Sequence, residues 1–251
     1  MKSIVVANWK MNPATFKEAK KLFEATRKAA ESAKNVSVIV APPAIFLREL
    51  SVGYKGKRLS FAAQNAHYEA GGAFTGEMSM TQAKDAKVSY VLVGHGERRA
   101  QGETNEDTRK KMFTALQLKI SPILCVGEKE RVADGDHFHI VREQIRTGLA
   151  DIVVGKLKQV VIMYEPLWAV GSGNPVTPRN MHEMFIFIKK TLVEMYGEAG
   201  MAMRILYGGS VTDSNAAAMI LEAGVQGFVV GGASLDPEKF KALVDSIETV
   251  A

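Results

Sequence analysis

The sequence predicts an α/β fold, a single (β/α)8 barrel with eight parallel strands. The prediction rests on alternation, because short apolar runs that end in polar or glycine-rich residues recur with helical patterns between them. The eight runs are Ile4–Lys10, Ser37–Pro43, Ser60–Ala66, Tyr90–Glu97, Pro122–Glu128, Val160–Pro166, Arg204–Gly209 and Gly227–Leu235. Runs such as Val160–Tyr164 are continuously apolar, which is typical of strands covered on both faces of a parallel sheet.

The length of the chain favours one domain. Its 251 residues are near the usual size of such a barrel and are short for two large domains. No linker rich in proline, glycine or serine interrupts the alternation, so residues 1–251 are predicted to form a single catalytic domain. The pattern alone also permits a doubly wound open sheet, which stays as the structural alternative.

Several helix boundaries can be predicted from local chemistry. Asn12-Pro13, Thr177-Pro178 and Asp236-Pro237 each place a capping residue before proline, which is favoured at the first helical position. Gly224 follows the run Ala216–Ala223 and is predicted to cap the C-terminus of that helix.

The composition is that of an ordinary globular protein, with 47% hydrophobic and 24% charged residues. The net charge of +5 comes from basic residues interleaved with acidic ones, without the aromatic-basic pattern of a nucleic-acid-binding module. No apolar stretch is long enough to cross a bilayer, and no secretory signal is recognisable. The single cysteine, Cys125, fits a reducing compartment. We therefore expect a cytoplasmic protein with no membrane or nucleic-acid partner, whose basic balance leaves room for a small anionic ligand.

Unusual polar residues follow the predicted strands, and the C-terminal ends of parallel barrel strands meet on one face. Asn8 and Lys10 end the first run, His95 and Glu97 the fourth, and Glu165 the sixth. Glu165 follows five apolar residues, so partial desolvation is expected to raise its pKa toward a value useful for a general base. A neutral His95 can donate a hydrogen bond to a substrate carbonyl, and Lys10 can stabilise a phosphate or an oxyanion. Each residue alone is also compatible with an ordinary structural or solvated role.

Glycine-rich segments predict a phosphate site. Gly208-Gly209-Ser210 and Gly231-Gly232 follow the last two strands, where backbone N–H groups can approach an oxyanion and where barrel enzymes often bind phosphate. The stretch Pro166–Pro175 is predicted to form a lid, with apolar residues in its middle. His137 and His139 are expected on a solvent-facing segment and Cys125 in the core. We therefore predict no metal site, and no dinucleotide or nucleotide-binding motif indicates a cofactor.

Five segments strongly resemble the triosephosphate isomerase family, in the same order and over essentially the whole chain. They are Asn8–Asn12, Gly94–Arg99, Tyr164–Ala169, Tyr207–Ser210 and Val230–Leu235. The resemblance implies a TIM barrel isomerase of glycolysis and gluconeogenesis that interconverts dihydroxyacetone phosphate and glyceraldehyde 3-phosphate through an enediolate, with no cofactor.

The resemblance also implies roles for individual residues. Glu165 is the base, His95 polarises the carbonyl, Lys10 stabilises negative charge, and Glu97 supports the site. The residues implied in substrate binding are Asn8, Lys10, Gly171, Ser210, Gly231 and Gly232. The segment Gly71–Glu77 resembles the loop through which the family forms homodimers, with Thr75 entering the neighbouring subunit.

Two departures from the family pattern carry expectations of their own. Gly96 stands where serine is usual, and loss of the hydroxyl is expected to free the resting orientation of Glu165 and to admit water. Pro175 in the far hinge restricts the backbone of Asn174 and predicts altered lid kinetics. Two other functions stay open: another phosphate-binding barrel enzyme, such as a sugar-phosphate epimerase or synthase, and a catalytically impaired binding scaffold.

Overall fold

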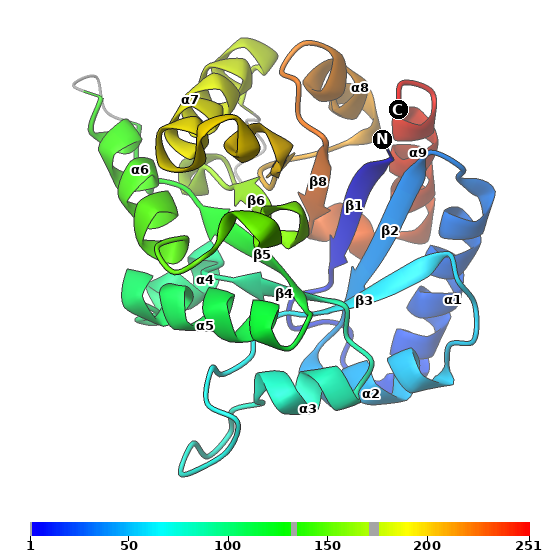
Figure 1. Ribbon diagram of the computed structural model, residues 1–251. Helices are drawn as coiled ribbons and strands as arrows, with labels where there is room; N and C mark the ends of the chain where they lie inside the picture. The colour runs from blue at the N-terminus through cyan, green and yellow to red at the C-terminus, as the bar shows by residue number, and fades with distance from the viewer. Residues whose placement is uncertain (1, 132–134, 171–175) are drawn as a thin grey trace.

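The strands close into a parallel barrel, as predicted (Figure 1). The computed structural model describes residues 2–131, 135–170 and 176–251. Among these residues the strands are β1 (Ser3–Asn8), β2 (Val36–Ala41), β3 (Leu59–Ala63), β4 (Tyr90–Val93), β5 (Ser121–Val126), β6 (Val161–Tyr164), β7 (Arg204–Tyr207) and β8 (Gly227–Val230). Each strand pairs in parallel with its sequence neighbours, and β8 pairs with β1. The closed pairing excludes the open-sheet alternative.

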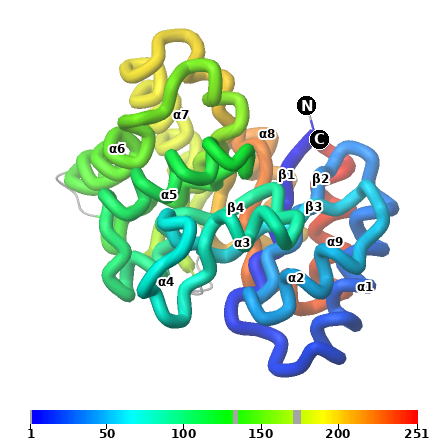
Figure 2. The backbone as a smooth tube through the Cα atoms, turned by 60° about the horizontal axis from the view of Figure 1, so that its bottom comes forward, coloured from blue at the N-terminus to red at the C-terminus, as the bar shows by residue number. Residues whose placement is uncertain are grey.

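Helices surround the barrel, as the two views in Figures 1 and 2 show. In the described part of the chain they are α1 (Phe16–Ser32), α2 (Ala44–Gly53), α3 (Met80–Asp85), α4 (Gly96–Ala100), α5 (Asn105–Gln117), α6 (Asp136–Gly148), α7 (Pro178–Tyr196), α8 (Asp213–Leu221) and α9 (Pro237–Glu248). Short 3-10 helices complete the described elements: η1 (Val154–Gln159), η2 (Leu167–Ala169), η3 (Gly197–Ala202) and η4 (Gly232–Leu235). None of the helices in the described ranges is long and apolar enough to span a membrane.

The continuously apolar strands divide their side chains between two cores. In β1, Ile4 and Val6 point into the barrel, whereas Val5 and Ala7 pack against the surrounding helices. Because both faces are covered, apolar residues run consecutively along the strands rather than at alternate positions. Cys125 is 1% exposed and belongs to the inner core, as predicted.

Barrel closure depends on a close approach between β8 and β1. Gly227 pairs with Ile4 and has a φ of +143°. A Cβ atom on Gly227 would lie 1.9 Å from the Ile4 carbonyl oxygen, so the two backbones come together only where no side chain is present.

Two of the predicted helix starts are confirmed and one is wrong. Thr177 and Asp236 are N-caps with proline directly after them. The helix predicted to begin at Pro13 instead begins at Phe16, because Thr15 and Glu18 form a capping box that satisfies two backbone N–H groups at that point. Gly224, predicted as a cap, lies beyond the cap residue Glu222 and donates its N–H to the Ile220 carbonyl.

Candidate active site

The polar residues at the ends of the strands meet in one cavity of about 470 Å³. Its lining includes Asn8, Lys10, His95, Glu165, Ser210, Gly231 and Gly232. Glu97 lies at an adjoining cavity and contacts Lys10, whereas Gly171 falls outside the described residues. Residues far apart in the sequence are therefore brought together at the face where barrel enzymes carry out chemistry.

Glu165 is a buried carboxylate, with only 3% of its surface exposed. Burial raises the pKa of Glu165, and nearby His95, the Gly96 N–H and Lys10 partly oppose the rise. The direction agrees with the sequence prediction. A carboxylate with a raised pKa is a stronger base than one in water, so the position suits proton abstraction from carbon.

His95 faces Glu165 with one ring nitrogen and the backbone with the other. Its Nδ1 accepts the backbone N–H of Glu97 at 3.3 Å, as the N-cap of α4. Because Nδ1 is an acceptor there, the ring is neutral and Nε2 carries the proton. His95 Nε2 lies 3.1 Å from Glu165 Oε1, so the imidazole and the carboxylate are in direct polar contact.

Gly96 does not leave Glu165 free, contrary to the expectation from the sequence. The Gly96 backbone N–H donates to Glu165 Oε2 at 3.0 Å, and His95 Nε2 lies 3.1 Å from Oε1. The space beside Gly96 is filled by Leu167, whose Cδ2 would lie 2.2 Å from a Cβ on residue 96. The Gly96 main chain therefore binds Glu165, and the Leu167 side chain fills the space where water was expected.

Lys10 has a strained backbone that its neighbours stabilise. Its φ is +52°, a left-handed conformation that is uncommon for residues other than glycine. The Lys10 N–H donates to Asn8 Oδ1 at 3.1 Å, and Gln64 Nε2 donates to the Lys10 carbonyl at 2.8 Å. The ammonium contacts Glu97 Oε1 at 2.6 Å, and the side-chain stem passes Gly231, where a Cβ would lie 3.0 Å from Lys10 Cε. The Lys10 side chain therefore passes beside the glycine-rich turn after β8, and its ammonium reaches Glu97.

That end of the cavity is built from two backbone turns. Gly208 and Gly209 follow β7, and a Cβ on either would lie within 3 Å of the Met163 sulfur or the Tyr207 hydroxyl. Gly231 and Gly232 begin η4 directly after β8. Side chains are small here, so backbone N–H groups and the helix N-terminal dipole are accessible to an anion.

Both ends of the predicted lid are anchored by hydrogen bonds. At the near end, the Leu167 N–H donates to the Glu128 carbonyl at 2.9 Å and Trp168 Nε1 donates to Glu128 Oε1 at 2.9 Å. At the far end, the Val176 N–H donates to the Tyr207 hydroxyl at 3.3 Å. The middle of the lid and the hinge residues Asn174 and Pro175 lie outside the described residues.

Sequence reasoning missed several residues that position the site. Gln64, Glu128, Leu167 and Tyr207 act through hydrogen bonds or packing across elements, and the sequence analysis gave none of them such a role. Leu167 and Tyr207 lie in segments that resemble the family pattern, and Glu128 ends the fifth apolar run, but none of these signals predicts the contacts. Glu128 is fully buried and accepts the hydroxyl proton of Tyr164 at 2.9 Å as well as the Trp168 indole.

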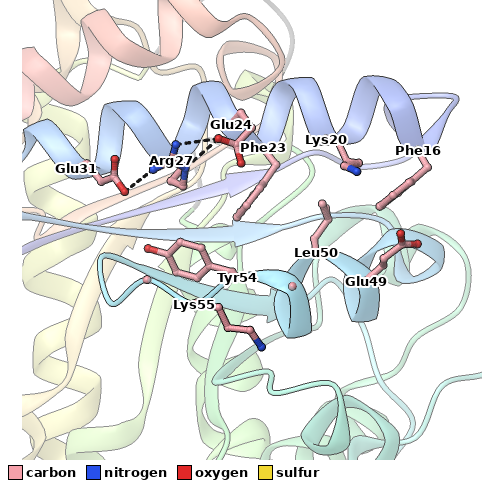
Figure 3. A pocket seen from close by; sticks show the side chains of 12 residues that line it. Phe16, Lys20, Phe23, Glu24, Arg27, Glu31, Glu49, Leu50, Tyr54 and Lys55 are labelled. Atoms are coloured by element: carbon pink, nitrogen blue, oxygen red, sulfur yellow. Dashed lines mark hydrogen bonds and ion pairs between the residues drawn. The ribbon is translucent and has the colours of Figure 1, made fainter.

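A larger cavity, of about 610 Å³, opens elsewhere, in a groove between α1 and α2 (Figure 3). Phe23, Leu50 and Tyr54 line it, and the guanidinium of Arg27 is neutralised by Glu24 and Glu31 on the same helix. The groove is on the helical layer and contains no strand-end residue. It is therefore less suited to chemistry than the smaller cavity at the ends of the strands.

His137 and His139 were both expected on a solvent-facing segment. His139 is exposed, as expected, but His137 is 5% exposed and packs against the Phe138 ring, because the start of α6 turns it inward. No cluster of three or more metal-ligating side chains occurs among the described residues.

Burial raises the pKa of the Cys125 thiol well above its usual value, so this cysteine is poorly suited to act as a nucleophile.

The fold and the cavity together define a barrel enzyme with a buried carboxylate, Glu165, and two glycine-rich turns at the C-terminal ends of its strands. The profile of the triosephosphate isomerase family matches residues 3–247. The chain is 42% identical over 246 residues to the triosephosphate isomerase of Endomicrobium trichonymphae, covering 97% of this chain and 98% of that protein. It is 38% identical over 244 residues to the triosephosphate isomerase of Moorella thermoacetica, covering 96% and 97%. The chain belongs to the triosephosphate isomerase family.

Glu165→Gln should change how stability depends on pH. Because burial raises the pKa of Glu165, the native state holds this proton more tightly than the unfolded chain, and the wild type loses stability as pH rises through that range. Glutamine does not titrate, so the variant's Tm minus the wild-type Tm should increase from pH 4 to pH 7. Differential scanning calorimetry measures both curves; a difference independent of pH contradicts the raised pKa.

Gly96→Ser should disturb Leu167 and, through it, Glu165. We expect kcat or KM to change by more than about twofold, equivalent to about 0.4 kcal/mol. Removing the obstructing atoms in the double variant Gly96→Ser/Leu167→Ala should reduce that effect relative to Leu167→Ala alone. Steady-state kinetics are measured for the wild type, the two single variants and the double variant. Additive effects on kcat/KM would show that positions 96 and 167 do not interact.

Proposed function

We propose that this cavity interconverts dihydroxyacetone phosphate and glyceraldehyde 3-phosphate, with Glu165 as the base and His95 as the electrophile. The observation that carries the proposal is the pairing of a buried carboxylate of raised pKa with a neutral imidazole 3.1 Å away. Membership of the triosephosphate isomerase family supports the same reaction. It does not favour another phosphate-binding enzyme or an impaired scaffold.

The reaction moves one proton between adjacent carbons. Glu165 removes a proton from the carbon next to the carbonyl, and the electron pair moves onto the carbonyl oxygen, giving an enediolate. His95 Nε2, 3.1 Å from Glu165 Oε1, is placed to hydrogen-bond that oxygen. The Lys10 ammonium stabilises the developing negative charge. A proton then moves by way of His95 from the adjacent hydroxyl to the former carbonyl oxygen. Glu165 returns its proton to the former carbonyl carbon and the new carbonyl forms at the neighbouring carbon, so that neither an oxidant nor a cofactor is consumed.

The phosphate binds at the glycine-rich end in this proposal. Ser210, Gly231 and Gly232 supply the lining there, with Gly171 expected to contribute from the lid. The anchors at Glu128 and Tyr207 suit a lid that covers the substrate. Exclusion of water protects an enediolate from losing its phosphate.

A coupled assay tests the function directly, with glyceraldehyde 3-phosphate supplied and dihydroxyacetone phosphate detected. Glu165→Ala should lower kcat by at least about 10²–10⁴-fold, the usual contribution of a general base. Glu222→Gln, which removes a negative charge from an exposed position, should leave kcat unchanged. Turnover no faster in the wild type than in Glu165→Ala refutes the isomerase proposal.

The protein is further proposed to be a homodimer through Gly71–Glu77. Every residue of this segment is exposed, and the loop projects from the barrel between β3 and α3 (Figure 1). Nearby surface includes Met11, 93% exposed, and Ile45, 82% exposed. A cavity of about 360 Å³ is lined by Met11 and Lys10 together with Gly76 and Glu77 of the loop. Exposed apolar side chains beside a cavity are characteristic of a surface that another subunit covers.

Thr75→Arg should dissociate the dimer, because it adds an unpaired charge at the centre of the loop. Sedimentation velocity at micromolar concentration should give a dimer for the wild type and a monomer for this variant. Val153→Arg adds the same charge at a different exposed position, preceding η1, and should remain dimeric. A monomeric wild type is the result that contradicts the proposal.

We also propose a cytoplasmic location and a single catalytic domain. A cytoplasmic location agrees with the buried, unpaired Cys125. A single catalytic domain agrees with a barrel whose described elements run from Ser3 to Glu248 without a second core of comparable size.

A further inference from the structure

Lys239 is a second lysine at the active-site cavity, and the reaction described above does not use it. It lies in the first turn of α9 and lines the cavity together with Ser210, Gly231 and Gly232. Its side chain is 74% exposed, so the ammonium stands at the solvent edge of the glycine-rich end. The helix to which it belongs packs against η4 and α8, which flank the same end.

The charges around the cavity differ in how closely they are paired. The Lys10 ammonium is 2.6 Å from Glu97 Oε1, whereas Lys239 Nζ is 3.8 Å from Asp236 Oδ2. A phosphate monoester carries nearly two negative charges at neutral pH, and the buried Glu165 carboxylate repels it. Because Lys239 is less closely paired, more of its field is available to an approaching dianion than is the field of Lys10.

The position of Lys239 opposes a local preference. A lysine in the first turn of a helix faces the positive end of the helix dipole, which is unfavourable. Asp236 compensates as the N-cap, because its Oδ1 accepts the N–H groups of Glu238 and Lys239 at 3.0 and 3.2 Å. Residues that contradict local preferences are concentrated at functional sites.

We propose that Lys239 attracts and orients the phosphate group of the substrate at the mouth of the cavity, and so contributes to specificity for phosphorylated trioses. The inference rests on the proposed isomerase function, and it adds a residue that acts in substrate binding, before the proton transfer. Lys239 does not touch the reacting carbons, so its effect falls on capture of the anion. The effect should therefore appear in KM and in kcat/KM, with kcat nearly unchanged.

Lys239→Gln tests the proposal, with Lys241→Gln as the matched control. Lys241 is on the same helix, pairs with Asp245 and does not line the cavity, and its substitution changes the net charge equally. One charge acting on a dianion at about 5–10 Å in water changes affinity by about fourfold to fifteenfold. We expect kcat/KM of Lys239→Gln to fall by that factor at low ionic strength, and Lys241→Gln to stay within twofold of wild type.

Three further measurements separate an electrostatic role from a structural one. The loss in Lys239→Gln should fade as salt is raised to about 0.5 M, because screening shortens the reach of exposed charges. Lys239→Arg, which keeps the charge, should retain wild-type kcat/KM. The inhibition constant of inorganic phosphate should rise in Lys239→Gln in parallel with KM.

The outcomes distinguish this proposal from the function on which it rests. Equal kinetics for Lys239→Gln and Lys241→Gln show that Lys239 is a solvated lysine only, and a loss independent of salt shows a structural effect; either overturns the proposal. An inactive wild type refutes the isomerase function instead. In that case, isothermal titration calorimetry with inorganic phosphate still tests the role of Lys239. Weaker phosphate binding in Lys239→Gln than in Lys241→Gln supports it, and equal binding overturns it.

Discussion

The rest of the site depends on keeping one carboxylate buried without neutralising it. Transfer of Glu165 out of water disfavours its charged form, and a fully apolar surrounding would leave it protonated and inert as a base. The Gly96 N–H donates to one of its oxygens and His95 Nε2 lies 3.1 Å from the other, and both contacts favour the charged form. The two groups come from adjacent residues at the end of β4, so one turn partly offsets the effect of burial on Glu165 and also brings the imidazole to the cavity.

The neutral state of His95 follows from the same turn. The start of α4 directs the Glu97 N–H at Nδ1, and this contact disfavours a second proton on the ring. A doubly protonated imidazole would pair tightly with Glu165 and lower its pKa, and so weaken the base. The short helix that follows β4 therefore contacts both groups, through the Glu97 N–H at His95 and the Gly96 N–H at Glu165. Lys10 completes the arrangement from the opposite strand, and its strained backbone persists because Asn8 and Gln64 hold it from two sides.

The sequence was most informative where structure is local or periodic. The strands followed from apolar runs, and the caps at Thr177 and Asp236 followed from the residue pairs at those positions. Asn12-Pro13 misled because a stronger capping box lies three residues further on. The consequence of Gly96 could not be predicted, since it depends on Leu167, a residue 71 positions away in the chain that packs over the glycine. Gln64 and Glu128 were missed for the same reason: their partners are distant in sequence, and one sequence does not disclose such contacts.

One end of the cavity is buried and the other is open to solvent, and the proposed reaction uses both. At the buried end, burial raises the pKa of Glu165 but also makes entry of an anion unfavourable, because two negative charges repel most strongly where solvent is excluded. At the exposed end, the glycine-rich turns and the proposed contribution of Lys239 attract the phosphate, but this end cannot raise a pKa by desolvation. A phosphorylated triose is long enough to place its phosphate at one end and its carbonyl at the other. Binding of the phosphate thus provides free energy that holds the reacting carbons against a carboxylate that would otherwise repel the substrate. The division explains why the most exposed residues of the cavity and the most buried ones serve the same reaction.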